Sequence, residues 1–276
     1  MSAPRTCNGA GSRWIRGGIF LLVLLTLMSC SVTLGTEEDV SPALELGILE
    51  LVPEYSGAAL DYYTPGSLTG ADAGDLPQQL DAALETAGLR ALAFSRAQDR
   101  DKVAVTRATA ERHDLESVSD LDRVAPELLF GGPPECPQRP TCLPGLERVY
   151  GLRFAGFISL DVGGPITSAA LADGVVDAAL LFTTDADVRV EDFVLLDDDR
   201  HLQPRQNIVP VVRPEVVQRF GSEAVDIIDA VSRRLTTRDL SLMDESAEQG
   251  RAPEQITLDW LERNGLIPQV ESREEG

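Results

Sequence analysis

The sequence has little of what most enzymes use for catalysis. Its two histidines, His113 and His201, do not stand in a Ser-His-Asp order, and the chain contains no glycine-rich phosphate loop and no metal-ligand cluster. The acidic run Asp197–Asp199 follows an apolar run and is more simply a solvated loop than a catalytic pair. We therefore expect a protein that is not an enzyme and that uses no cofactor and no metal ion.

Basic residues are also scarce. The three arginines before Cys30 have no acidic residue near them, and without that segment the chain keeps 21 basic and 45 acidic residues, a net charge of −24. Such a negative chain repels nucleic acid and anionic lipid, so we expect no nucleic-acid partner. The charge is compatible with a cationic ligand, and equally with the solubility of an exported protein.

The chain has one long apolar run, Ile19–Met28, which is too short for an ordinary transmembrane helix. A basic stretch that ends at Arg16 precedes this run, and Leu27-Met28-Ser29-Cys30 at its end resembles a bacterial lipobox. We predict that residues 1–29 are a lipoprotein signal peptide and that Cys30 carries the lipid. The protein would then be extracytoplasmic and lipid-anchored to the cell membrane. A plain secretory signal or a signal anchor is the alternative.

Cysteine is rare, and its four copies have different predicted fates. Cys7 leaves with the signal peptide and Cys30 is the lipid site, so Cys136 and Cys142 remain. In an oxidising compartment a close pair like this predicts a disulfide around a small loop. The alternative, a zinc site, needs two further ligands, and neither histidine is near in the sequence.

Three short apolar runs predict a fold of the α/β class. Phe157–Leu160, Ala178–Phe182 and Phe193–Leu196 each end in polar loop residues. Continuous runs of this length between helical patterns are typical of buried parallel strands in βαβ units. Ligands bind beyond the carboxyl ends of such strands, so these polar loops predict a binding cleft.

The rest of the chain predicts short strands and amphipathic helices around these runs. Further strands are expected at Ile48–Val52, Leu89–Phe94, Val103–Thr106, Leu128–Phe130 and Ile208–Val212. Helices are expected at Ala58–Tyr63, Leu76–Thr86, Pro165–Asp173, Arg213–Phe220, Ala224–Leu235, Thr237–Glu248 and Ala252–Asn264. We expect residues 268–276 to be a disordered tail.

Several segments together resemble one known family. Ala43–Gly57, with its Leu-Val-Pro-Glu-Tyr-Ser-Gly, is similar to the block PALxxGxIDLVPEYTG of glycine betaine/choline/carnitine-binding proteins. Later blocks follow in the family's order, at Asp161–Thr167, Leu180–Asp185, Leu196–Pro204 and Val209–Arg213. Each block alone is a weak match, but their order and spacing make the set specific, and the resemblance covers roughly Leu34 to Ile267.

The resemblance implies a type II periplasmic-binding-protein fold, in which two α/β lobes close on a ligand. Lobe one would comprise residues 34–106 and 206–267, and lobe two residues 107–205. The family implies an extracytoplasmic solute-binding subunit of an ABC importer, which captures a quaternary-amine osmoprotectant of the glycine betaine, choline or carnitine type. Its partners would be that small molecule, the ABC permease and ATPase subunits, and the membrane through the lipid anchor.

A quaternary ammonium group cannot donate a hydrogen bond, so aromatic faces hold it by cation–π attraction. By the resemblance, Tyr55 and Phe182 fall on cage positions, and Arg139 falls on the arginine that grips the ligand carboxylate. Each has a plainer alternative: a tyrosine packed in a turn, the last core residue of a strand, and a solvated loop charge. Thr183 and Asp185 are expected to shape the loop that follows the strand.

Three positions depart from the family pattern. Lys102 and Gln206 stand near positions where relatives carry cage aromatics, and Ala58 stands where a threonine is frequent. These departures reduce the cage to about two members, and with aromatics at 5% of the chain few substitutes exist. The candidates are Tyr62, Tyr63 and Tyr150. The ligand could then be less methylated, more polar, or a compound other than betaine.

The start of lobe one also departs from the family. Relatives have one further βαβ unit before the block that begins here at Leu34, typically about 30 residues. Either this is a shortened copy, or another element fills the gap; an uncovered apolar sheet edge would favour aggregation or partner pairing. An alternative function therefore stays open, a binding-fold lipoprotein that has lost transport and acts as a sensor or interaction protein.

Overall fold

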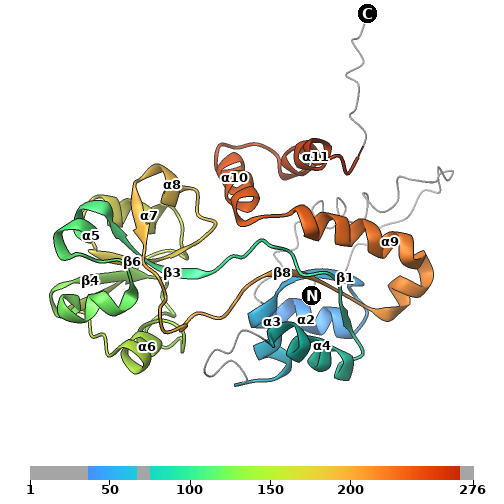
Figure 1. The fold of residues 1–276 in the computed structure, drawn as a ribbon, viewed down its shortest axis with the longest axis horizontal. Helices are drawn as coiled ribbons and strands as arrows, with labels where there is room; N and C mark the ends of the chain where they lie inside the picture. Colours follow the sequence, from blue (N-terminus) through green and yellow to red (C-terminus); the bar gives the residue numbers. More distant parts are fainter. Residues whose placement is uncertain (1–36, 67–74, 268–276) are drawn as a thin grey trace, which may run out of the picture. The chain divides into compact units, whose positions relative to one another are not determined.

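Two β-sheets organise the part of the chain that the computed structural model describes, residues 37–66 and 75–267 (Figure 1). The first sheet has the strand order β1-β8-β2, and the second has the order β5-β4-β6-β3-β7. The strands are β1 Leu51–Tyr55, β2 Arg90–Ala91, β3 Asp101–Thr106, β4 Leu129–Gly132, β5 Gly156–Ser159, β6 Ala178–Phe182, β7 Phe193–Leu195 and β8 Ile208–Val212. The predicted α/β class is confirmed.

Helices surround both sheets. The α-helices are α2 Glu37–Glu45, α3 Ser56–Tyr63, α4 Leu76–Thr86, α5 Arg107–His113, α6 Leu143–Gly145, α7 Pro165–Ala172, α8 Asp187–Val190, α9 Pro214–Arg234, α10 Thr237–Glu248 and α11 Pro253–Arg263, and short turns of other helix types are η1 Val118–Arg123, η2 Ala125–Glu127 and η3 Leu146–Tyr150. No helix within the described ranges combines the length and the apolar character that a membrane crossing requires. The predicted signal peptide 1–29, the lipid site Cys30 and the tail 268–276 lie outside the described residues.

The helices α2, α3 and α4 pack on the first sheet, and we call this group the first lobe. α4 begins and ends where the sequence predicts it, because Leu76, Leu80, Ala83 and Leu84 recur at helical spacing and are all buried. They form one core with the inward-facing residues of β1 and β8. The members of this core include Leu44, Val52, Leu60, Val209 and Val211.

Strand β1 runs three residues later than the predicted strand Ile48–Val52, and it contains Pro53. The predicted boundary is wrong because a proline in a strand is tolerated where no ladder hydrogen bond is needed. The amide of Arg213 donates to the carbonyl of Glu50, and the amide of Ser56 donates to the carbonyl of Asn207. In this register the even-numbered residues of β1 bond to β8, so Pro53 faces the outer edge of the sheet.

The second sheet carries a core on each face, and we call this sheet with its helices the second lobe. Side chains alternate along β3, so Val103 and Val105 join one core while Ala104 joins the other. The first of these cores includes Phe130, Tyr150, Leu180 and the disulfide-bonded cysteines, and the second includes Leu171, Val176 and Leu181 from α7, the loop after it and β6. The predicted disulfide between Cys136 and Cys142 is confirmed, and both cysteines are fully buried.

The expectation of parallel strands is confirmed in part. β4 pairs parallel with β5 on one side and with β6 on the other. β7 instead pairs antiparallel with β3, which itself pairs antiparallel with β6. The reason is that β3 enters this sheet from the first lobe and lies between β6 and β7, which the apolar runs alone do not reveal.

The pairing of β3 also moves a predicted boundary. The predicted lobe one extends to residue 106, but Asp101–Thr106 forms the fourth strand of the second sheet. Two segments connect the sheets: one leads from β2 into β3, and the other returns from β7 to β8 (Figure 1). They bond to each other, because the amide of Asp99 donates to the carbonyl of Gln206 at 3.1 Å and the amide of Ile208 donates to the carbonyl of Ala97 at 3.1 Å.

Three C-terminal helices follow β8. The two helices predicted over 213–235 are both present within α9, on either side of a kink at Gly221, where φ is +76° and the backbone is not helical. Only glycine adopts this angle at little cost, so the break lies there. α9 and α10 also hold the segment that leads into β3. The carboxylate of Asp229 accepts the amide of Ala93 at 2.9 Å, and the hydroxyl of Thr237 accepts the amide of Gln98 at 3.0 Å.

Candidate ligand-binding site

Tyr55 lies at the point where β1 passes directly into α3. It is the last strand residue and the residue before the helix, with extended backbone angles. Its side chain is 38% exposed, and its hydroxyl donates to Oδ2 of Asp99 at 3.2 Å. Because the ring is neither covered by the core nor fully solvated, it retains an aromatic face that a ligand can reach.

Gln206 and Ala58 meet at the N-terminus of α3. The side-chain oxygen of Gln206 accepts the amides of Gly57 at 3.0 Å and of Ala58 at 3.1 Å. The first amides of a helix have no partner within the helix, so this contact stabilises the helix start. A Cβ on Gly57 would lie 2.6 Å from the carbonyl oxygen of Arg205, so only glycine allows the return segment to approach this closely. Gln206 therefore serves α3, in a place where the resemblance implies an aromatic ligand contact.

Asp99 connects Tyr55 to the end of β6. Its second carboxylate oxygen accepts the hydroxyl of Thr184 at 2.6 Å. Asp99 is not among the residues that the sequence predicts for the site. No local pattern identifies this residue, because its two partners lie 44 and 85 positions away along the chain. The link places the predicted aromatic Tyr55 near the strand end that carries Phe182.

Phe182 is the last residue of β6, and its register partner on β3 is Asp101. Residues that face each other in an antiparallel pair have their side chains on the same side of the sheet, with Cβ atoms about 5 Å apart. A Cβ on Gly163 would lie 2.3 Å from Cδ2 of Phe182, so the ring packs over the backbone of the loop before α7. This contact explains the glycine, and it fixes the ring at the strand end.

Asp101 is buried, at 7% exposure, and its Oδ2 forms an ion pair with Arg139 of the disulfide loop. The loop is held in turn by its own backbone, because the amide of Arg139 donates to the carbonyl of Glu135 and the amide of Cys142 donates to the carbonyl of Arg139. Burial raises the pKa of Asp101, and the charge of Arg139 opposes that rise. The predicted carboxylate-binding arginine is thus brought close to Phe182, but a protein carboxylate already occupies its guanidinium.

Lys102 does not lie beside Phe182. Its register partner is Leu181, and because side chains alternate along a strand, Lys102 points to the opposite face from Asp101. Its Nζ lies 4.0 Å from Oδ1 of Asp197. Burial and then the charge of Arg100 lower the pKa of Lys102. Lys102 therefore lies on the other face of the strand pair from Phe182, and its predicted place near the cage stays a prediction.

Thr183 follows Phe182 and joins the two segments that enter and leave this region. Its hydroxyl donates to the carbonyl of Gln98 at 3.1 Å and accepts the amide of Arg100 at 3.0 Å. Two residues on, Oδ2 of Asp185 accepts the amide of Phe182 at 2.7 Å. These are the contacts of residues that shape a loop, as the sequence analysis expected for both.

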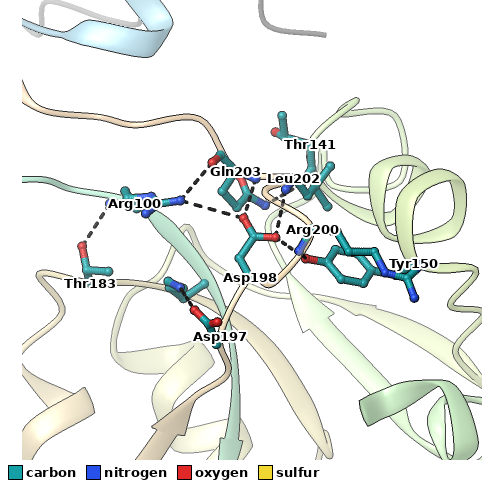
Figure 2. A network of polar contacts seen from close by, with 10 residues as sticks. Arg100, Thr141, Tyr150, Thr183, Asp197, Asp198, Arg200, Leu202 and Gln203 are labelled. Carbon is teal, nitrogen blue, oxygen red and sulfur yellow. Dashed lines mark hydrogen bonds and ion pairs between the residues drawn. The ribbon is translucent and has the colours of Figure 1, made fainter. Parts of the chain in front are cut away.

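The return segment starts in a buried polar network around Asp198, which Figure 2 shows from close by. Asp198 is 5% exposed, and its carboxylate accepts the hydroxyl of Tyr150 and the amides of Leu202 at 2.9 Å and Gln203 at 2.7 Å. A guanidinium nitrogen of Arg100 lies 3.9 Å from it (Figure 2). The expectation that Asp197–Asp199 is a solvated loop is wrong for Asp198, whose burial depends on partners distant in the sequence.

The three substitute tyrosines have other roles. The Tyr150 ring is buried, and its hydroxyl also accepts the amide of Arg200 at 2.8 Å (Figure 2). Burial and then the bond to Asp198 raise the pKa of Tyr150. Tyr62 and Tyr63 pack edge to face on α3, with ring centroids 5.0 Å apart. Among these candidates, Tyr55 and Phe182 thus remain the two aromatic residues that the structure links to one place.

Acidic groups gather around these two rings. Burial raises the pKa of Asp185 to about 7, against the hydrogen bond from the Phe182 amide, and the charges of Asp99 and Asp244 add to the rise. Asp244 belongs to α10, and burial raises its pKa as well. In the part of the chain that the structure describes, no group of three or more His, Cys, Asp or Glu side chains is placed to hold a metal ion. The chemistry of the region is that of a negative environment with aromatic faces, which suits an organic cation.

Residues 30–263 match the family described as the substrate binding domain of ABC-type glycine betaine transport systems. The chain is 30% identical over 239 residues to a glycine-betaine-binding protein of Pseudomonas aeruginosa, covering 82% of this chain and 75% of that protein. It is 27% identical over 247 residues to the glycine betaine-binding protein YehZ of Escherichia coli, covering 85% and 80%. It is also 24% identical over 236 residues to the ergothioneine transport permease/ergothioneine binding protein EgtU of Helicobacter pylori, covering 84% of this chain and 41% of that protein.

Solved structures have the same fold. A glycine betaine/carnitine/choline ABC transporter structure superposes with a TM-score of 0.74 at 20% identity, covering 90% of this chain and 93% of that chain. The apo form of YehZ from Escherichia coli superposes with a TM-score of 0.66 at 24% identity, with the same coverage. These likenesses confirm the periplasmic-binding fold that the resemblance implies.

Proposed function

Because this chain belongs to the family of substrate-binding domains of ABC-type glycine betaine transport systems, we propose that it is the extracytoplasmic solute-binding subunit of an ABC importer. Its ligand is a quaternary amine of the glycine betaine, choline or carnitine type. The ligand is captured by the two lobes, which close about the connecting segments and then dock on the permease. The lipid on Cys30 keeps the protein at the membrane where that permease lies.

The observation that carries the proposal is the link from Tyr55 through Asp99 to Thr184, beside Phe182. It joins Tyr55 of the first lobe, through a carboxylate, to Thr184, which stands two residues after Phe182 of the second lobe. A cation within about 6 Å of an aromatic centroid gains roughly 0.5–2 kcal/mol, more when it is desolvated. Two rings and nearby carboxylates together therefore favour a methylated cation over a neutral solute.

The test is a calorimetric titration of the purified chain with glycine betaine, choline, carnitine and proline betaine. Tyr55→Ala and Phe182→Ala should each weaken binding about 2- to 30-fold, because each removes one cation–π contact. Phe220→Ala is the matched control, since it removes an aromatic ring that stacks on Arg219 of α9. If the folded protein binds none of the four compounds, the ligand assignment is wrong.

The alternative function, a sensor or interaction protein that has lost transport, has one specific observation in its favour. Gln206 takes an aromatic position of the family, and its side chain stabilises α3. Measurements of ligand binding and of cellular uptake distinguish the two functions. A protein that binds choline or betaine, but whose removal from the cell leaves uptake of the labelled compound unchanged, is a sensor.

A further inference from the structure

We infer that the ligand is a quaternary ammonium alcohol rather than a quaternary ammonium carboxylate, and that Asp101 determines this preference. The inference rests on the proposed function and narrows its ligand class from betaine, choline or carnitine to the choline type. It depends on the acidic partners of three basic side chains and on one carboxylate oxygen of Asp101.

Each basic side chain around β3 already faces a protein acid. Arg139 pairs with Asp101, Lys102 lies 4.0 Å from Asp197, and Arg100 lies 3.9 Å from Asp198. Arg100 also donates to the carbonyl of Gln203 at 3.0 Å. A ligand carboxylate is held by free arginine or lysine side chains, and these three are engaged.

The carboxylates near Tyr55 and Phe182 attract a positively charged ligand. Asp99 accepts from Tyr55 and Thr184, and Asp101 faces Phe182 across the β3–β6 pair. A ligand that brings a single positive charge is attracted by both acids. A zwitterion would place its own carboxylate near the two acids, and these like charges would repel each other.

One buried oxygen of Asp101 lacks a hydrogen-bond donor. Oδ1 of Asp101 is buried and has no hydrogen-bond partner among the described residues, although Oδ2 is paired with Arg139. Leaving a buried carboxylate oxygen without a donor is unfavourable. The hydroxyl of a choline-type ligand can donate to it. The carboxylate of a betaine cannot, because an ionised carboxylate is only an acceptor.

Choline and glycine betaine form a matched pair of probes for this inference. Both carry a trimethylammonium group on a two-carbon chain, and they differ only in a hydroxymethyl group against a carboxylate. We expect the purified full chain to bind choline at least about 10-fold more tightly than betaine, the effect of one charge-assisted hydrogen bond. The measurement is calorimetric titration of both compounds at one pH and one ionic strength.

Asp101→Asn tests the residue itself. It frees Arg139 and puts an amide donor in place of a carboxylate oxygen, so choline affinity should fall about 10-fold and betaine affinity should rise. Glu147→Gln is the control: it removes one negative charge from the same lobe, from an exposed pair with Arg153. The control should leave the ratio of the two affinities unchanged, which separates a local effect from one of net charge.

The outcomes are distinct. Betaine binding as tight as choline in the unchanged protein overturns the inference and leaves the proposed function standing. Loss of that betaine binding in Arg205→Gln would then identify this exposed arginine of the return segment as the carboxylate contact. No binding of either compound by folded protein overturns both the inference and the proposed function. The comparison in the unchanged protein decides the question even where Asp101→Asn does not fold.

Discussion

The two lobes support their shares of the candidate site very differently. In the first lobe, three strands and three helices enclose one core. In the second, five strands carry a core on each face, a disulfide and a buried network around Asp198. Phe182, Asp101 and Arg139 therefore stand on a rigid frame, whereas Tyr55 ends an edge strand. If these residues contact the ligand as proposed, the second lobe would set the ligand preference and the first lobe would supply a contact of lower local stability.

Truncation of one core leucine in each lobe should have the largest effect on the stability of the two lobes. Leu84 and Leu181 are both fully buried, so Leu84→Ala and Leu181→Ala should each cost about 2–5 kcal/mol of unfolding free energy. If the first lobe is the weaker unit, Leu84→Ala exposes its amides to hydrogen exchange while those of β6 stay protected. Equal loss of protection in both lobes would show that they unfold as one unit.

Tyr150→Phe should have the next largest effect. It removes the hydroxyl that donates to buried Asp198 and accepts the amide of Arg200, so the unfolding free energy should fall by about 1–3 kcal/mol. Denaturant unfolding measures this loss. Tyr62→Phe is the control, because Tyr62 lies on α3 in the other lobe and contacts the ring of Tyr63. A loss no larger than in the control would mean that the network does not stabilise the second lobe.

The acid at the end of β6 predicts a pH dependence. The pKa of Asp185 is about 7 in the folded protein and near 3.8 when it is unfolded, so the folded state binds the extra proton. Its contribution to stability is present at low pH and is lost as pH rises through the window from about 4 to about 7.

Asp185→Asn removes this titration and keeps an oxygen that can accept the amide of Phe182. The variant should be more stable than the unchanged protein at pH 8, by about 1 kcal/mol after allowance for solvent screening, and should lose most of that advantage at pH 5. Chemical unfolding at the two pH values measures the difference. An advantage that does not depend on pH would contradict the assignment.

The smallest effect is expected at Lys102, which is the one lysine in the sequence. Because it faces Asp197 on the other side of β3 from Asp101, Lys102→Gln should change ligand affinity less than about 3-fold. Titration with choline and betaine tests this. A large gain in affinity would mean that Lys102 lies near the ligand and repels it, which contradicts its place on the other face of β3.

Local pattern was enough to predict elements whose boundaries depend on local chemistry. Ala178–Phe182 is a continuous apolar run between Asp177 and Thr183, and β6 has those bounds. Leu76–Thr86 has a clear helical spacing and a proline in its first turn. The predicted bounds of β1 were wrong because of Pro53. A strand accepts a proline only where the proline nitrogen faces away from the neighbouring strand, and the sequence does not show this.

The sequence predicts site residues where they belong to a family motif. It does not predict the site residues that lie outside any motif. Tyr55, Phe182 and Arg139 came from the family resemblance, and their roles as ligand contacts remain predictions. Asp99, Asp101 and Asp198 were missed as site residues because Asp99 and Asp198 stand in ordinary acidic segments and Asp101 begins a strand without a local motif. Their importance follows from partners on other strands and loops, which strand register and the disulfide loop bring near them.

The proline on the outer edge of β1 has a consequence for how this protein behaves at high local density. Only odd-numbered residues of β1 direct backbone groups outward, and of Leu51, Pro53 and Tyr55 the middle one has no amide hydrogen. A strand of a neighbouring molecule that approached this edge would find two donors separated by a gap. Copies at high concentration can thus stay individually folded, because this edge of the smaller sheet offers no continuous template for another chain.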